Sequence, residues 1–140
     1  MNRDKFVLKF SSVSSNESFA RSVIGLFALR VNPSVAFLTD IKTAVSEAVT
    51  NCIVHGYPEK DGDIIMEGYI QDGYIHINVF DFGVGIENLS EALEPFYTSK
   101  EDEERSGMGF TIMKSFMDDV KVVSAKGEGT KVYMSKKIGE

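Results

Sequence analysis

A glutamate and an asparagine, Glu47 and Asn51, stand four residues apart in a segment with helical periodicity. Side chains at this spacing lie one above the other on a helix surface, and His55 continues the row. A carboxylate and an amide oxygen are hard ligands of the kind that Mg²⁺ takes, and Mg²⁺ usually completes its shell with waters and substrate phosphates. The pair therefore suits a metal-bound phosphate group. A polar helix boundary with a histidine near the C-terminus also explains the pattern.

A second candidate is the acid in the segment Asp81-Phe82-Gly83-Val84-Gly85, which follows a strand pattern. Alternation sends Asp81 to the apolar side of that strand, where a carboxylate needs a partner. A carboxylate only accepts hydrogen bonds, and the exocyclic amino group of adenine donates them. Gly83 and Gly85 would let the backbone pass close to a flat ring. A plain turn is the alternative interpretation of so short a motif.

The segment Gly107-Met108-Gly109-Phe110 ends a polar stretch and opens a helix. Free N–H groups at a helix start can cradle a phosphate, and glycines permit its close approach. A glycine-punctuated loop exit is the alternative here. No G-x-x-x-x-G-K-[ST] segment is present, which excludes a P-loop.

The polar stretch 94–107 is acidic and too long for an ordinary connector, a length typical of lids. Lys100 and Arg105 are its only basic residues, and such a cation is either solvated or able to reach a terminal phosphate. Near the other end of the chain, Thr130 follows Gly129 at the start of a strand. Its hydroxyl could support Asp81 at the base or simply belong to the turn.

Two helices are expected in the first half of the chain. The capping-box spacing of 14–17 predicts a helix start, and Asn32-Pro33 predicts its end. A longer helix is expected from about Ser34 to His55. At about 100° per residue, Asn51 falls at the border of its apolar face and Glu47 further out. The stripe that defines this face consists of Leu38, Ile41, Val45, Ala48 and Cys52.

Five segments outside these two helices have the alternating pattern of strands. Residues 63–71 and 74–81 read as strands joined by Asp72-Gly73, which tolerates the positive φ angles of a two-residue hairpin and puts Ile64 opposite Asp81. Further strands are expected at 5–10, 121–125 and 131–136, and helices near 89–93 and from Gly109. Because helices and strands do not strictly alternate, we expect an α+β fold. It should be a two-layer α/β sandwich with a mainly antiparallel mixed sheet and helices on one face.

Composition limits the function classes. A chain of 140 residues with 43% hydrophobic residues is expected to form a single domain. The net charge of −6 argues against nucleic acid or an anionic membrane as the main partner. The longest apolar run, 23–29, is far shorter than the roughly 20 residues of a membrane span. The single cysteine, Cys52, cannot form an internal disulfide, which fits a reducing cytoplasm.

The order of these motifs is more specific than any one of them. Glu-x-x-x-Asn on a helix, Asp-x-Gly-x-Gly after a strand, Gly-x-Gly-Phe at a helix start and Gly-Thr near the end occur in that order. Together they resemble the ATP-binding domain shared by DNA gyrase, a class of heat-shock chaperones, histidine kinases and mismatch-repair ATPases. Within that superfamily the chain resembles the anti-sigma F factors of sporulating bacteria, a family of serine protein kinases. The likeness is densest in 16–21, 45–51, 55–57 and 104–113.

The resemblance assigns roles to residues along the chain. It implies that Glu47 is the catalytic base, that Asn51 binds Mg²⁺ and that Arg105 lies near the terminal phosphate of ATP. Arg21 would belong to the docking surface for a sigma factor and its competing partner. The phosphates would be bound by Ser106, Gly107, Met108, Gly109 and Phe110.

At the adenine, the resemblance implies contacts from Asp81, Gly83, Gly85 and Thr130. Phe82 departs from the family pattern, in which an acidic residue is expected at this position. Phe82 is not itself expected to bind, so the departure concerns local packing only.

The resemblance implies a Mg²⁺-ATP-dependent serine kinase that inhibits a sporulation sigma factor, sigma-F, and phosphorylates an anti-anti-sigma factor. The expected protein is a cytoplasmic homodimer without nucleic-acid or membrane partners, formed by one ATP-binding domain, 1–140, with a flexible lid at about 94–107. The same chemistry on a general-stress sigma-factor module is one alternative. An ATP-shaped binding module without turnover is another, against which Glu47 argues, because binding alone needs no base beside the metal.

Overall fold

The computed structural model describes residues 4–87, 89 and 108–139. Its described strands form one five-stranded sheet in the order β1-β2-β3-β5-β4. The elements are β1 (Asp4–Ser11), α1 (Asn16–Ala28), η1 (Leu29–Val31), α2 (Val35–Asn51), η2 (Cys52–Gly56), β2 (Asp63–Gln71), β3 (Tyr74–Asp81), α4 (Gly109–Phe116), β4 (Asp119–Ser124) and β5 (Thr130–Lys137).

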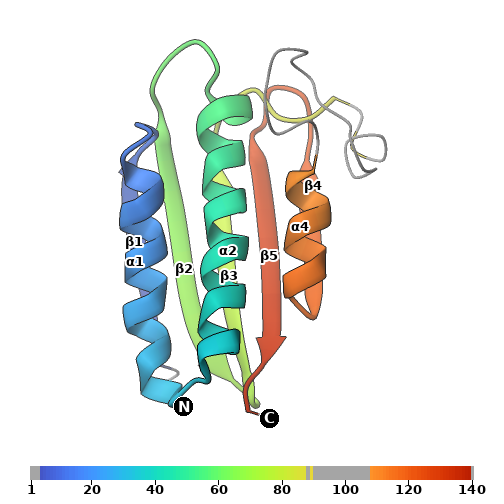
Figure 1. The fold of residues 1–140 in the computed structure, drawn as a ribbon. Helices are drawn as coiled ribbons and strands as arrows, with labels where there is room; N and C mark the ends of the chain where they lie inside the picture. The colour runs from blue at the N-terminus through green and yellow to red at the C-terminus, as the bar shows by residue number, and fades with distance from the viewer. Residues whose placement is uncertain (1–3, 88, 90–107, 140) are drawn as a thin grey trace.

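The architecture is a two-layer α/β sandwich, as expected from the sequence. Helices α1, α2 and α4 lie side by side on one face of the sheet, with α2 between the other two (Figure 1). Every pairing among the described strands is antiparallel. The sheet was expected to be mainly antiparallel, and in the described part of the chain it is entirely so.

The hairpin of β2 and β3 has the predicted ends and register. Gln71 pairs with Tyr74 and Ile64 with Asp81. Asp72 and Gly73 adopt φ angles of 56° and 82°, as a two-residue turn of this kind requires. The register sends the side chains of alternate β3 residues into the core, where each is at most 3% exposed: Ile75, Ile77, Val79 and Asp81.

Helix α1 begins where the sequence indicated, but the predicted capping box is wrong. The N-cap is Ser15, whose side chain makes no capping hydrogen bond. The Glu17 carboxylate binds Arg21 at 2.9 Å, one turn further along the helix, rather than a backbone N–H at the helix start. Because the helix starts one residue later than the capping box requires, a helical i, i+4 ion pair replaces it. The left-handed Asn32 (φ 52°) then ends η1.

Helix α2 has the predicted start and an unusual end. Ser34 caps it through a hydrogen bond from the Phe37 N–H. The chain continues through η2, a π-helical turn in which the Tyr57 N–H donates to the Cys52 carbonyl. Expected and observed boundaries thus agree, with a widened last turn that the sequence pattern did not indicate.

The core fills the space between the three helices and the sheet. Its fully buried side chains include Ile24 of α1, Val45 of α2, Met66 of β2 and Met113 of α4. None of the helices in the described part of the chain is long and apolar enough to cross a bilayer. The helix expected near 89–93 and the lid expected at 94–107 fall largely or wholly outside the described residues.

The hairpin turn provides a test of the register. Gly73→Ala should lower the free energy of unfolding by about 1 kcal/mol, because a Cβ is disfavoured in the left-handed region. Strain is the only expected cost, since an added Cβ would meet nothing within 4 Å. Urea denaturation measures the change. The control Asp72→Asn keeps a residue that tolerates positive φ and should change stability by less than about 0.5 kcal/mol. Equal losses in both variants would contradict the turn assignment.

Candidate functional site

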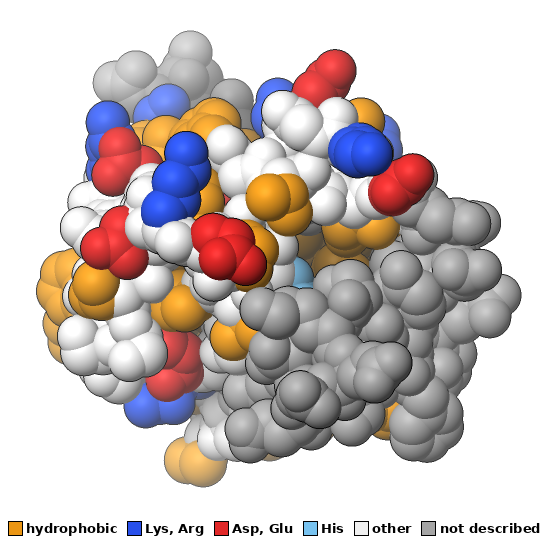
Figure 2. Space-filling model, turned by 90° about the horizontal axis from the view of Figure 1, so that it is seen from above, with side chains coloured by type: hydrophobic (Ala, Val, Ile, Leu, Met, Phe, Trp, Pro, Cys, Tyr) orange, Lys and Arg blue, Asp and Glu red, His pale blue; other side chains and the backbone are white. Residues whose placement is uncertain are grey.

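Those predicted nucleotide-site residues that the structure describes gather at one end of the molecule. Four element termini lie at the same end of the sheet (Figure 1): the end of α2, the end of β3, the start of β5 and the start of α4. Figure 2 looks down on this end, where charged side chains of both signs lie beside apolar ones. Segments that are far apart in sequence therefore share one region of the structure.

Asp81 lies at the centre of this region and is only 3% exposed. Its Oδ1 accepts hydrogen bonds from the Gly83 N–H at 3.0 Å and the Thr130 N–H at 3.2 Å. The Cys52 thiol also hydrogen-bonds the carboxylate. The acid thus has the partners that its burial requires.

Burial sets the ionisation of both side chains in this contact. It raises the pKa of the Asp81 carboxyl, and the hydrogen bonds from Gly83, Cys52 and Thr130 only partly oppose that rise. Burial, reinforced by the nearby Asp81 charge, also raises the pKa of the Cys52 thiol well above its ordinary value. Cys52 is therefore a protonated thiol, able to donate to the acid.

Two glycines allow η2 to approach the loop after β3. A Cβ at Gly56 would lie 2.7 Å from Asp81 Oδ2, and a Cβ at Gly83 would lie 1.8 Å from the Gly56 carbonyl oxygen. That same carbonyl accepts a hydrogen bond from the Val84 N–H at 2.9 Å. Gly83 was predicted to make room for a ring, whereas the contact that the structure shows is with the backbone of η2.

The other end of this loop packs on the turn between β4 and β5. Gly85 has a φ of 74°, and a Cβ there would lie 1.9 Å from the Ala125 carbonyl oxygen. The Gly127 N–H donates to the Val84 carbonyl at 2.6 Å. The loop from Asp81 to Gly85 is therefore held on both sides by the backbone of the protein itself.

Tyr57 is a residue of this site that the motif analysis did not single out for a role. Its hydroxyl donates to the Asp63 carbonyl at 2.6 Å and accepts from the Phe82 N–H at 2.7 Å. It thereby joins the start of β2 to the residue after Asp81. The Phe82 side chain, where the sequence departs from the family pattern, is 57% exposed.

Glu47 and Asn51 lie on α2 as predicted, but their relative burial is the reverse of what was expected. Glu47 is 8% exposed, whereas Asn51 is only partly buried. Helices α1 and α4 pack on both sides of α2, so its buried arc is wider than the single apolar stripe from which the sequence prediction was made. Asn51 reaches the start of α4, because a Cβ added at Gly109 would lie 2.8 Å from Asn51 Nδ2.

The predicted phosphate segment is described only in part. Gly109 begins α4, Met108 is its N-cap residue, and Phe110 buries its side chain in the core. Phe110 could therefore serve a phosphate at the helix start through its backbone N–H, as Gly109 could, and not through its side chain. The predicted site residues Arg105, Ser106 and Gly107 lie outside the described residues.

Thr130 pairs with Asp81 across the sheet, so both lie on the same face. The Thr130 hydroxyl was expected to support Asp81 or to belong to the turn, but it is the Thr130 backbone N–H that donates to the Asp81 carboxylate, while the hydroxyl contacts Ser124 Oγ at 2.8 Å. Ser124 was not identified from the sequence. The only signal for it was its place at the end of a strand that could pair with the one starting at Thr130.

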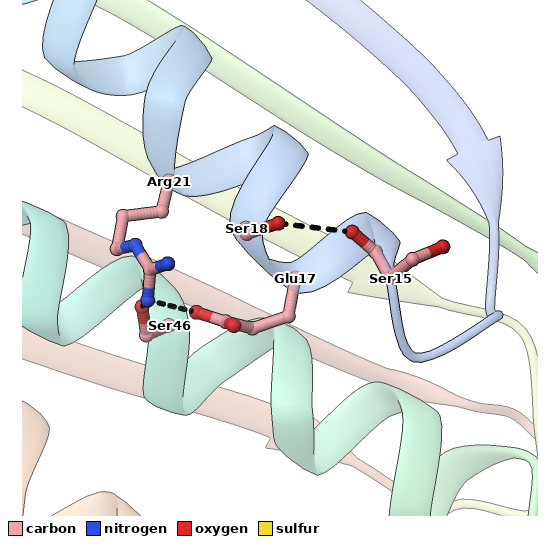
Figure 3. Close-up of polar contacts among 5 residues, drawn as sticks. All are labelled: Ser15, Glu17, Ser18, Arg21 and Ser46. Carbon is pink, nitrogen blue, oxygen red and sulfur yellow. Dashed lines mark hydrogen bonds and ion pairs between the residues drawn. The ribbon is translucent and has the colours of Figure 1, made fainter.

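Arg21 lies on α1 and extends toward α2. It binds the Glu17 carboxylate at 2.9 Å and contacts the Ser46 hydroxyl at 3.4 Å (Figure 3). The Arg21 side chain is still 41% exposed. Ser46 immediately precedes Glu47 in the sequence, so this guanidinium is a surface group close to the α2 row.

The arrangement has two chemically distinct halves. Around Asp81 and Thr130 stand oxygens that accept hydrogen bonds, which suits an amino-bearing base such as adenine. At Asn51 and Gly109, an amide side chain lies against the N-terminus of a helix, which suits phosphate and, through the amide oxygen, a hard cation. Cys52 follows Asn51 in sequence and contacts Asp81, so the two halves adjoin.

Comparison with known proteins gives consistent results. The family model of the histidine kinase-like ATPase domain matches residues 13–136. The chain is 53% identical over 137 residues to the anti-sigma F factor of Clostridium acetobutylicum, covering 98% of this chain and 96% of that protein. It is 52% identical over 132 residues to the anti-sigma F factor of Caldanaerobacter subterraneus subsp. tengcongensis, covering 94% and 92%.

Solved structures with low sequence identity share the fold. The RsbU and RsbW domains of a Mycobacterium tuberculosis protein match with a TM-score of 0.70 at 15% identity, over 96% of this chain and 32% of that one. The catalytic domain of histidine kinase ThkA matches with a TM-score of 0.58 at 16% identity, over 99% and 97%.

The raised pKa of Asp81 predicts how stability changes with pH. The folded protein holds this proton more tightly than the unfolded chain, so the free energy of unfolding falls as pH rises from the ordinary aspartate range through the raised value. Asp81→Asn removes this titration, and its amide oxygen can still accept from Gly83 and Thr130. The stability difference, variant minus wild type, should therefore grow as pH rises above about 4. Urea denaturation across this range measures it, and a pH-independent difference would contradict the assignment.

Proposed function

The chain belongs to the anti-sigma F factor family of histidine kinase-like ATPase domains, and from this premise we propose that it is an ATP-dependent serine protein kinase. Its proposed clients are a sigma factor of the sigma-F type, which it binds and inhibits, and an anti-anti-sigma factor, which it phosphorylates on serine. The observation that carries the proposal is that a buried acceptor, Asp81, contacts Cys52, the residue that follows Asn51, while the Asn51 side chain lies against Gly109 at the start of α4.

The base half of the site supports ATP as the nucleotide. Asp81 is held by backbone donors at Oδ1 and offers only acceptor capacity when ionised. Adenine presents an amino group to such a carboxylate, whereas guanine presents a carbonyl oxygen at the same ring position. A site that accepts hydrogen bonds therefore favours adenine, because guanine would leave two acceptors facing each other.

The phosphate half supports group transfer. The serine hydroxyl oxygen of the client bonds to the γ-phosphorus as the bond to the β–γ bridging oxygen breaks, and ADP leaves. Glu47 takes the hydroxyl proton as general base. Glu47 is buried on α2. It lies one turn before Asn51, so the two side chains share a row on the helix surface.

Asn51 would hold Mg²⁺ through its amide oxygen, which is a hard ligand, and its side chain lies against Gly109 at the helix start where phosphate is expected. Bound there, the ion would offset negative charge on the phosphates. Arg105, from the segment 94–107, is proposed to act on the terminal phosphate. The phosphate N–H groups are proposed to come from the segment 106–110.

The partners are proposed from the family. Arg21, exposed beside Glu17 and Ser46, is proposed to dock the sigma factor and its competitor. A homodimer, a role in sporulation and a cytoplasmic location belong to the same proposal. A single ATP-binding domain across 1–140, with a lid at about 94–107, completes it.

The role of Glu47 is testable by separating transfer from binding. Glu47→Gln keeps the shape of the side chain and removes the base, so serine phosphorylation should slow by about 10²- to 10⁴-fold. Nucleotide affinity should change little. The measurements are phosphate transfer from labelled ATP to the anti-anti-sigma protein and ADP titration by calorimetry.

Glu67→Gln is the matched control, because Glu67 lies on β2 and binds Asn78 Nδ2 at 2.9 Å, a bond that glutamine can still accept. This control should phosphorylate at the wild-type rate. A Glu47→Gln protein that also does so would refute the base assignment. A wild-type protein that binds ATP without any transfer would instead favour the binding-module alternative.

The docking role of Arg21 is tested by Arg21→Ala. Binding of the sigma factor should weaken by at least about tenfold, because arginines are frequent hot spots of interfaces. Loss of the partly exposed ion pair with Glu17 should cost less than about 1 kcal/mol of stability. Arg30→Ala is the control, since Arg30 is similarly exposed and bound to Asp4. Wild-type affinity of Arg21→Ala for both partners, measured by calorimetry, would remove Arg21 from the interface.

A further inference from the structure

One serine hydroxyl beside the proposed base site has three hydrogen-bond partners. Ser124 Oγ lies 2.8 Å from the Ile86 N–H nitrogen, 2.9 Å from the Gly129 carbonyl oxygen and 2.8 Å from Thr130 Oγ1. These partners come from the loop after β3, the turn before β5 and the first residue of β5. Ser124, at the end of β4, is thus a junction of the segments that surround Asp81.

Counting hydrogens fixes the direction of each bond. A hydroxyl has one hydrogen to donate and two lone pairs. The Gly129 carbonyl can only accept, so the Ser124 hydroxyl donates its one hydrogen to that oxygen. The Ile86 N–H can only donate, so the Ser124 oxygen accepts from it. The remaining contact, with Thr130, then requires Thr130 to be the donor. The Thr130 hydroxyl hydrogen is therefore directed toward Ser124.

This direction decides what Thr130 can offer a ligand. Because the Thr130 hydroxyl donates its hydrogen to Ser124, its oxygen presents only lone pairs on the face that Thr130 shares with Asp81. A threonine free to rotate could instead donate to a carbonyl oxygen. Ser124 thereby gives the hydroxyl the same accept-only character as the carboxylate beside it.

We infer that Ser124 is a specificity-determining positioning residue, which fixes the Thr130 hydroxyl as an acceptor and so disfavours guanine nucleotides. The inference rests on the proposed function, because it concerns the base of the nucleotide bound at Asp81. Ser124 need not touch the nucleotide. It acts through Thr130, on a base held directly or through a water.

A purely structural role for Ser124 would leave a different signature. Loss of its oxygen also removes the acceptor of the Ile86 N–H, which would loosen the loop after β3 and weaken every nucleotide alike. The ratio of ATP to GTP affinity is insensitive to such a uniform loss. This ratio is therefore the quantity to measure.

The experiment is a double-mutant cycle on the full chain, with ATP and GTP affinities measured by calorimetry. Ser124→Ala should lower the ATP preference by about tenfold, the effect of roughly one net hydrogen bond. Thr130→Val, which keeps the side-chain shape, should lower it by a similar factor. In the Thr130→Val background, adding Ser124→Ala should cause no further change, because the hydroxyl on which Ser124 acts is gone.

Two further variants complete the design. Ser124→Thr restores a hydroxyl and should restore the ATP preference. Ser135→Ala, on the opposite face of β5, is the control for a serine loss elsewhere in the sheet and should leave the preference unchanged.

The outcomes separate the two proposals. If the wild-type protein prefers ATP and Ser124→Ala keeps the full preference, the inference is wrong while the proposed function stands. The inference would also be wrong if Ser124→Ala lowered the ATP preference by the same factor in the wild-type and the Thr130→Val backgrounds. If the wild-type protein binds neither nucleotide, the proposed function fails and the inference fails with it.

Discussion

Burial of the Asp81 carboxylate at the end of β3 is the constraint on which this end of the molecule depends. An acid that is 3% exposed needs donors, and three separate segments supply them through Cys52, Gly83 and Thr130. Gathering these donors around one side chain forces η2, the loop after β3 and the start of β5 into backbone contact. The tight glycine contacts follow from that crowding, and so does an acceptor directed at whatever occupies the site.

The parts of the fold that follow local rules were predictable from the sequence. Asp72-Gly73 determined the hairpin register, and the register with the two-residue alternation placed Asp81 inside. Proline, asparagine and glycine signals located the ends of α1 and α2. The order of four short motifs indicated the ATPase superfamily whose family model matches the chain, and the longer segments of likeness indicated the anti-sigma F factors, to which the chain is also similar over nearly its full length.

The parts that depend on neighbours distant in the chain were not predictable in this way. Glu47 is buried because helices flank α2, which the period of a single helix cannot reveal. Glu17, which was expected to cap the helix, accepts a hydrogen bond from Arg21 instead of from a backbone N–H. Ser124 lies near Asp81 because β4 pairs with β5 and because its hydroxyl accepts from the Ile86 N–H. No spacing in the sequence indicates that these segments come together. Hydroxyl direction in particular is a property of a completed network.

The π-helical end of α2 has a consequence for how this chain tolerates change in length. Its widened turn holds one residue more than an α-helical turn, and that extra residue brings Gly56 against Asp81 and Gly83. Removing one residue from this turn would bring Tyr57, with a full side chain, toward a place where even a methyl group collides. Spacing is thus as constrained as residue identity at this junction, and indels there should be far rarer in functional variants than conservative exchanges at the same positions.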